Sequence, residues 1–229
     1  MADTPPDIPT KKSISLRMAM LMFLGVALVS VAIKVGLHWS QIPEKRIPAD
    51  LQRVLLPTPR EIPNIKLVHH DKSPFTPEQF KGKWDVLFFG YTHCPDVCPM
   101  ALGRLSEVFA ILEKREPHIF KKLQGIFVSV DPKRDTAEHL AEYVSYFHDG
   151  FVGVTGEAEQ IKLLARAVGA GYFIQKPDKD GNYEVNHTTS LFLVDPTGQY
   201  VGAISPDGVT PETMAAMLVR VHDHFEPKK

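Results

Sequence analysis

Short, continuous runs of apolar residues alternate with helix-type patterns along most of the chain. Such runs are typical of strands that are buried on both faces of a sheet. They occur at residues 86–89, 126–130, 151–154, 191–194 and 200–204, with weaker strand patterns at 65–68 and 172–174. The runs at 191–194 and 200–204 are joined by Asp195-Pro196-Thr197-Gly198, a turn sequence with proline second and glycine fourth, which predicts an antiparallel hairpin.

Apolar residues spaced three and four positions apart predict amphipathic helices after several of these strands. The clearest sets are Leu105, Val108, Phe109 and Leu112; Leu140, Tyr143, Val144 and Phe147; Ile161, Leu164, Ala165 and Val168; and Met214, Met217, Leu218, Val221 and Phe225. Asp135 with Glu138 resembles a capping box for the second of these helices, and Thr210-Pro211 predicts the start of the last. Thr76-Pro77-Glu78 predicts one short helical turn.

The first of these helices follows the run at 86–89 through a segment that holds both cysteines of the chain, Cys94 and Cys98. A proline deep in a helix clashes with the carbonyl group four residues earlier, so we expect the helix to start near Pro99 rather than at Pro95. The two cysteines then lie on a strand-to-helix turn, where their sulfurs can converge on a disulfide or on one metal ion. The helix N-terminus is expected to favour thiolate over thiol.

The order of the elements (βαβ, an αβ insertion, then ββα) predicts an α/β, thioredoxin-like fold over residues 62–225, with a central mixed sheet flanked by helices. Parallel strands end at one edge of a sheet, so the cysteine turn and Asp131 share that edge. A strand antiparallel to them begins there, and residues 191–194 are the candidate. The preceding loop, residues 186–189, then approaches the cysteines, which makes His187 the third member of a site at the carboxyl ends of the strands.

The N-terminus has a different pattern, because residues 18–33 carry no charge. Lys34 interrupts the run, but apolar residues continue to 39, so residues 18–39 approach the roughly 20 residues that a membrane helix needs. Basic residues before the run predict that residues 1–17 are cytoplasmic and that the remainder faces the periplasm. A cleaved signal peptide would have similar features, but no small-x-small cleavage motif follows the run, which favours an uncleaved, single-pass transmembrane anchor.

The remaining parts of the chain fit one domain with appendages. Prolines cluster in residues 40–61 without a sustained period and predict a semi-extended linker, while residues 226–229 form a C-terminal tail. A hydrophobic content of 44% is enough for one well-packed domain. The formal net charge of −1 gives no indication of a nucleic-acid partner. Asp3 and Asp7 argue against a mitochondrial transit peptide and favour the bacterial cytoplasmic (inner) membrane.

Three segments, GYTHCPDVCP, SVDPKRDT and NHTTSLFLVDPTGQYVGAI, resemble the signature segments of the Sco/SenC family. That family consists of membrane-tethered, thioredoxin-fold copper proteins that assist assembly of the binuclear copper centre of cytochrome c oxidase. The resemblance implies that Cys94, Cys98 and His187 bind copper, and that the partners are the copper-bearing oxidase subunit and other periplasmic copper carriers. The chain departs from the family at Asn186, where an aspartate commonly precedes the histidine.

The chemistry of these side chains supports the resemblance. Two thiolates and one imidazole suit Cu(I) and can also hold Cu(II). A structural zinc site would require a fourth protein ligand, and His93 could supply it only by folding back from the residue before Cys94. The cysteines could instead be buried structural thiols or a plain disulfide. Asp131 and Asp135 are interpreted as turn and cap residues rather than catalytic acids.

Three functional classes remain open. The leading hypothesis is a metallochaperone that binds one copper ion, as Cu(I) or Cu(II), and delivers it to cytochrome c oxidase. The second is a thiol-disulfide oxidoreductase in which Cys94 and Cys98 are the redox-active, catalytic pair that reduces the cysteines of the recipient. The three residues between the cysteines, instead of the two that are usual in thioredoxins, weaken that hypothesis. The third is a copper or redox sensor.

Overall fold

The protein is described by a computed structural model that covers residues 16–40 and 46–226. It divides into two units, Met1–Arg46 and Ile47–Lys229. Helix α1 (Leu16–Ser40) belongs to the first unit. Among the described residues, no helix has the length and apolar character needed to cross a membrane. Residues 1–15 of the predicted N-terminal tail, 41–45 of the predicted linker and 227–229 of the predicted C-terminal tail lie outside the described residues.

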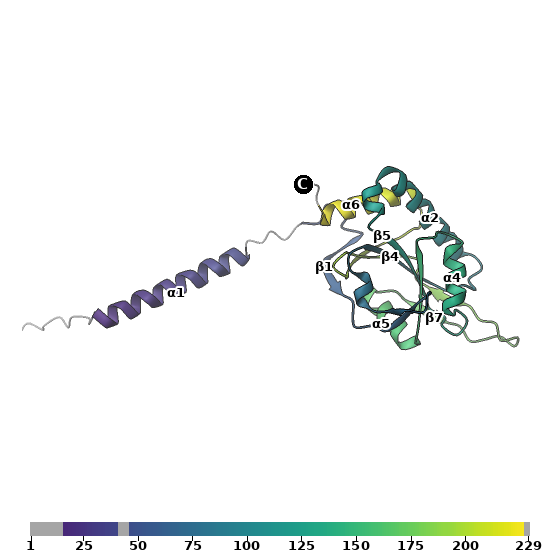
Figure 1. The fold of residues 1–229 in the computed structure, drawn as a ribbon, viewed down its shortest axis with the longest axis horizontal. Coiled ribbons are helices and arrows are strands. Elements are labelled where there is room, and N and C mark those ends of the chain that lie inside the picture. Colours follow the sequence, from purple (N-terminus) through teal and green to yellow (C-terminus); the bar gives the residue numbers. More distant parts are fainter. Residues whose placement is uncertain (1–15, 41–45, 227–229) are drawn as a thin grey trace, which may run out of the picture. The chain divides into compact units, whose positions relative to one another are not determined.

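The second unit is built on an eight-stranded mixed sheet with the order β1-β10-β9-β4-β5-β6-β2-β3 (Figure 1). Strands β4, β5 and β6 are parallel, and the other neighbouring pairs are antiparallel. The strands of this sheet are β1 (Leu55–Glu61), β2 (Leu67–His69), β3 (Pro74–Phe75), β4 (Trp84–Gly90), β5 (Leu123–Ser129), β6 (Phe151–Thr155), β9 (Leu191–Val194) and β10 (Gln199–Ile204). A separate two-stranded sheet contains β7 (Tyr172–Ile174) and β8 (Val185–His187).

Helices cover both faces of the large sheet. Helices α2 and α6 contact each other on one face, and α5 lies on the opposite face (Figure 1). Helix α4 packs along β6. The helices of the second unit are η1 (Pro77–Phe80, a 3₁₀ turn), α2 (Val97–Arg115), α3 (Pro117–Phe120), α4 (Ala137–Ser145), α5 (Ala158–Val168) and α6 (Pro211–Phe225). The result is the predicted arrangement of a central mixed sheet flanked by helices.

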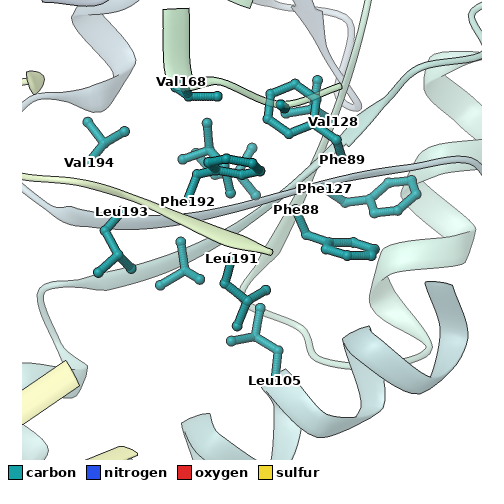
Figure 2. Close-up of a cluster of buried hydrophobic side chains, with 14 of the residues drawn as sticks. Phe88, Phe89, Leu105, Phe127, Val128, Val168, Leu191, Phe192, Leu193 and Val194 are labelled. Atoms are coloured by element: carbon teal, nitrogen blue, oxygen red, sulfur yellow. The ribbon is translucent and has the colours of Figure 1, made fainter. Parts of the chain in front are cut away.

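The core lies on both sides of β4, whose residues are all buried. Successive strand side chains point to opposite faces, so Phe88 and Phe89 serve different layers. The ring of Phe88 lies against Phe127, with 6.2 Å between centroids, and that of Phe89 lies against Phe192 at 5.5 Å. Figure 2 shows Leu105 and Val168 on opposite sides of these strands. Because both faces of β4 are covered, its sequence is a continuous apolar run rather than an alternating one.

The strand pairing that the site depends on agrees with the sequence analysis. Strands β4 and β5 are parallel and in register from Trp84↔Leu123 to Gly90↔Ser129. Strand β9 runs antiparallel beside β4, and β10 continues as the predicted hairpin. The loop before β9 therefore does reach the edge at which β4 ends.

The predicted linker over residues 40–61 is wrong at both ends. Residue 40 is the last residue of α1, and Leu55–Glu61 forms β1, which pairs antiparallel with β10. Pro57 and Pro59 are tolerated because β1 is an edge strand, where a proline costs no ladder hydrogen bond on its outer side. The folded unit therefore begins before the predicted boundary at residue 62.

Two predicted helix starts are also wrong. Helix α2 begins at Val97 rather than near Pro99, so Cys98 lies in its first turn. Pro99 is accommodated there because the carbonyl four residues earlier belongs to Pro95, which precedes the helix. Helix α4 is capped by Thr136, whose side chain accepts a hydrogen bond from the backbone N–H of His139, and not by Asp135.

Candidate metal centre

The two cysteines are held at different depths by the end of β4 and the start of α2. Cys98 is fully buried in the first helical turn, whereas Cys94 is half-buried in the turn before it. The backbone N–H of Cys98 lies 3.5 Å from the Sγ of Cys94, so the first turn of the helix directs a donor at the outer sulfur. Both cysteines are free thiols in the structure.

Gly90 makes room for the inner sulfur at the end of β4. A Cβ at this position would lie 2.7 Å from Cys98 Sγ and 2.8 Å from Cε2 of Phe127. Neither distance is compatible with normal packing, and the Phe127 ring is fully enclosed by the core. The glycine that ends the apolar run therefore has a direct structural role in the site.

His187 is the last residue of β8 and lies on the other side of the inner sulfur. Its Nε2 lies 3.2 Å from Cys98 Sγ, and its Nδ1 lies 3.1 Å from the carbonyl oxygen of Thr188. Only an N–H can donate to a carbonyl, so the proton belongs on Nδ1 and the lone pair of Nε2 faces the sulfur. The His187 ring forms T-shaped contacts with the rings of Phe88 and Tyr91, whose centroids are 5.7 Å and 6.1 Å away, and these contacts fix its orientation.

The structure thus brings together all three residues that the sequence analysis placed at the site. One ligand atom from each of Cys94, Cys98 and His187 can be chosen so that all three lie within 4.8 Å of one another. Two sulfurs and an imidazole nitrogen are the donors that suit copper, and Cu(I) in particular. No fourth histidine, cysteine, aspartate or glutamate joins this group among the described residues. The donor set therefore fits a copper ion with an incomplete protein shell.

Burial sets the protonation of the metal-free site. It raises the pKa of the Cys98 thiol, and the neighbouring Cys94 adds to the effect, while a hydrogen bond with the backbone of Tyr91 opposes it. The prediction that the helix N-terminus favours a thiolate is therefore wrong for Cys98 in the absence of metal. Burial also lowers the pKa of His187, which keeps the imidazole neutral and its Nε2 available to a metal.

A hydrogen-bonded cluster behind the site was not predicted. The hydroxyl of Tyr183 donates to Asp131 Oδ1 at 2.8 Å, and Asp131 also pairs with the side chain of Arg134. The guanidinium of Arg134 lies 3.7 Å from the centroid of the Tyr183 ring and 5.5 Å from that of Tyr91. Tyr183 lies between β7 and β8, so this cluster holds the hairpin that carries His187. Asp131 was interpreted as a turn residue, and no local pattern pointed to Tyr183.

The remaining sequence candidates lie apart from the three ligand atoms. His93 belongs instead to a group with Asp135 and His139. Asp135 is fully buried, and its side chain accepts hydrogen bonds from Thr92 and Ser129. Asn186, the position that departs from the Sco/SenC pattern, is exposed and opposite Phe173 in the small sheet.

Comparison with known proteins identifies the family. The family model described as SCO1/SenC matches residues 57–223. A SCO2-like protein of Rickettsia felis is 33% identical over 152 residues, which cover 66% of this chain and 72% of the relative. The mitochondrial protein SCO2 of Saccharomyces cerevisiae is 40% identical over 144 residues, 61% of this chain and 46% of the relative, so the match spans about half of that protein.

Solved structures show the same fold with copper bound. Bradyrhizobium japonicum ScoI with copper bound has a TM-score of 0.62 and 35% identity, covering 70% of this chain and 98% of that one. Arabidopsis thaliana ScoI with copper bound has a TM-score of 0.65 and 29% identity, covering 72% and 98%. The chain described here is a member of the SCO1/SenC family with its thioredoxin-like fold.

Proposed function

We propose that this protein is a copper carrier that holds one copper ion with Cys94, Cys98 and His187 and delivers it to the binuclear copper centre of cytochrome c oxidase. The observation that carries the proposal is the grouping of these three ligand atoms within 4.8 Å. The copper-bound relatives support the choice of metal. The oxidase as recipient rests on the resemblance to the Sco/SenC family.

The geometry suits a carrier because the cargo can be held without being enclosed. A closed, four-ligand cage releases its ion slowly, whereas three protein ligands leave a position that a ligand of the recipient can occupy first. Cys94 is the half-buried member and forms the outer side of the site. The recipient can therefore approach from the side of Cys94, while Cys98 and His187 keep the ion in place until the exchange is complete.

The same sulfurs favour a second candidate function, thiol-disulfide exchange. The more exposed Cys94 would attack a disulfide of the recipient, forming a mixed disulfide and releasing one thiolate of the partner. Cys98 would then attack the sulfur of Cys94, which closes an internal disulfide and releases the second thiol. The different burial of the two cysteines fits these two roles. An internal disulfide would remove both sulfur ligands, so reduction and copper binding exclude each other in one molecule.

Copper titration of the reduced, full chain tests the carrier proposal. Under anaerobic conditions we expect one Cu(I) per chain, and the variants Cys94→Ala and Cys98→Ala should each lose tight binding. His69→Ala, which changes a histidine outside the site, is the matched control and should bind as the wild type does. A disulfide-reduction assay on the same samples measures the second function. Wild-type copper affinity in both cysteine variants would place the copper site elsewhere.

We also propose that the apolar N-terminal segment, residues 18–39, anchors the protein in the bacterial cytoplasmic (inner) membrane with the folded unit in the periplasm. The uncharged residues 18–33 and the basic residues before them support this location. A reporter fused after Lys229 should be active only if it is exported, and the protein should stay with the membrane fraction. Recovery of a processed, soluble fragment that starts after the apolar run would instead support a cleaved signal peptide.

A further inference from the structure

A second group of possible ligands lies beside the candidate copper centre and shares none of its residues. We propose that His93, Asp135 and His139 form a second metal site, which takes a divalent cation of borderline hardness such as Cu(II) or Zn(II). One ligand atom from each of these residues can be chosen so that all three lie within 4.8 Å of one another. The proposal does not depend on copper delivery, because it rests on these residues alone.

The carboxylate of Asp135 is fixed in position and has acceptor capacity to spare. Its Oδ2 accepts hydrogen bonds from the backbone N–H of Thr92 at 3.0 Å and from the hydroxyl of Ser129 at 2.6 Å. Its Oδ1 accepts one from the hydroxyl of Thr92 at 2.6 Å. A carboxylate oxygen can accept two, so Oδ1 keeps a lone pair, and this is the oxygen that lies 3.6 Å from Nδ1 of His93. Such supporting bonds are what orient metal-ligating carboxylates.

The two imidazoles reach this carboxylate from different elements. His93 comes from the turn after β4, and His139 comes from the first turn of α4, which is fixed by the bond from its backbone N–H to the Thr136 side chain. The two rings stand edge to face, with 5.6 Å between centroids and 88° between planes. The side chain of His93 is 46% exposed, so an ion can enter from solvent and water can complete its shell.

One pair of ligand atoms, His93 Nδ1 and Asp135 Oδ1, is spaced almost as it would be in a loaded zinc site. Zinc–nitrogen and zinc–oxygen bonds of about 2.0–2.1 Å place two ligands of a tetrahedral ion about 3.4 Å apart. The 3.6 Å between His93 Nδ1 and Asp135 Oδ1 therefore needs almost no change. In the metal-free protein the same nitrogen lies 3.1 Å from the Thr92 hydroxyl. A cation would replace that contact, and the proton of the neutral ring would then belong on Nε2.

The donor chemistry separates the two sites by the ions that they prefer. Two imidazoles and one carboxylate suit borderline divalent ions, whereas the two sulfurs of Cys94 and Cys98 suit Cu(I). Cu(I) should therefore bind only at the candidate copper centre of Cys94, Cys98 and His187, at one ion per chain. A divalent ion added afterwards should find the second site. The protein would then hold two different metal ions at neighbouring positions of the same sheet edge.

The test uses Co(II), whose absorption spectrum reports its ligands, added to the full chain after one equivalent of Cu(I). We expect one Co(II) to bind with ligand-field bands and without the intense sulfur-to-cobalt band that thiolate ligands produce. His139→Ala and His93→Ala should each weaken this binding about tenfold or more. His118→Ala is the matched control, because His118 also forms a histidine pair, with His222 at 6.0 Å between centroids, and it should leave Co(II) binding unchanged.

A second experiment tests the His93–Asp135–His139 site in a protein that lacks both cysteines of the copper centre. The double variant Cys94→Ser/Cys98→Ala is titrated with Cu(II), and electron paramagnetic resonance should show nitrogen and oxygen ligands that disappear on adding His139→Ala. If that double variant does not fold, the Co(II) titration of the Cu(I)-loaded full chain decides whether the second site exists. The proposal is overturned if Co(II) binding is absent, shows a sulfur band, or is unchanged by both His93→Ala and His139→Ala. Loss of Cu(I) binding with Co(II) binding kept would contradict the copper carrier and leave this second site supported.

Discussion

Cys98 Sγ lies 3.2 Å from Nε2 of His187, although 89 positions separate the two residues in the chain. The sheet creates this proximity. Cys98 follows the end of β4, and His187 precedes the start of β9, which pairs antiparallel with β4 through Val86↔Leu193 and Leu87↔Phe192. The contact is therefore a consequence of strand pairing, and changes that disturb the end of β4 should disturb the copper site.

Gly90→Ala tests this dependence directly. The new methyl group would need the space of Cys98 Sγ and of the Phe127 ring, at 2.7 Å and 2.8 Å. We expect copper affinity to fall at least tenfold and the free energy of unfolding to fall by about 1–3 kcal/mol, as in other overpacked cores. Competition titration with a Cu(I) chelator and urea unfolding measure the two effects.

The matched control is Gly103→Ala in α2, where a Cβ would meet no atom within 4 Å. That variant should keep its copper affinity and gain about 0.5–1 kcal/mol, because alanine is the better helix former. Equal copper affinity in the two variants would show that the space at Gly90 does not matter to the site.

The sequence was informative where hydrophobic pattern and topology act together. The apolar run that became β4 and the periodic helices that follow it predicted the parallel strands, because burial on both faces leaves a clear signal. The step to His187 came from topology, since an antiparallel strand must start where its neighbours end. That rule depends on the fold class and not on the loop sequence, so it succeeded even though residues 186–189 have no hydrophobic periodicity of their own.

Elements stabilised by distant partners could not be predicted. The sequence of β1 is LLPTPRE, and its prolines and polar residues are typical of a linker. It forms a strand because it pairs with β10, which lies far away in the sequence. Only three residues form β8, and they pair with β7. The raised pKa of Cys98 comes from burial, which is a property of the packed core, whereas the local sequence showed only the nearby helix N-terminus.

Gly202→Ala tests whether β1 is part of the folded unit. A Cβ at Gly202 would lie 2.0 Å from the carbonyl oxygen of Val54, which also accepts a hydrogen bond from the backbone N–H of Ala203 at 2.9 Å. The methyl group should force β1 away from β10, at a cost of about 1–3 kcal/mol. Limited digestion with trypsin should then cut after Arg60, which β1 protects in the wild type. If the segment were a free linker, both proteins would be cut there at the same rate.

Asp85 should make the protein less stable as the pH rises. It is fully buried in β4, and neither carboxylate oxygen has a hydrogen-bond partner among the described residues. Burial raises the pKa of this carboxyl group to about 8, and Lys83 opposes the shift. Between pH 4 and pH 8 the unfolded chain has lost this proton while the folded chain retains it. The free energy of unfolding should therefore fall across that range, by on the order of 5 kcal/mol from this group.

Asp85→Asn, which keeps the shape and cannot ionise, isolates the effect. Urea unfolding of the wild type and the variant should give similar free energies at pH 5 and a more stable variant at pH 9. The difference between the two proteins removes the contribution of every other titrating group. Parallel pH curves would mean that Asp85 has the same pKa in the folded and unfolded states.

His187→Ala separates the carrier from the reductase. Cu(II) prefers nitrogen ligands, so its retention should fall strongly, whereas two thiolates can still hold Cu(I) and its retention should fall less. The reduction potential of the Cys94–Cys98 disulfide should move little. Burial lowers the pKa of His187, so the ring that the variant loses is neutral and removes no charge from beside the thiols. The ring also packs against Phe88, so thermal unfolding must show that the variant is folded. His69→Ala serves as the control in each measurement.

In cells the two functions predict different phenotypes for this variant. A carrier that needs its third ligand should fail to load the oxidase with copper, although its cysteines still cycle between thiol and disulfide. A reductase needs only a reactive thiol and access to the partner disulfide, so it should work without His187. Oxidase assembly is measured by its copper content and activity in strains that carry His187→Ala or Cys94→Ala. Normal assembly with His187→Ala together with failure with Cys94→Ala would contradict the three-ligand carrier and support the reductase.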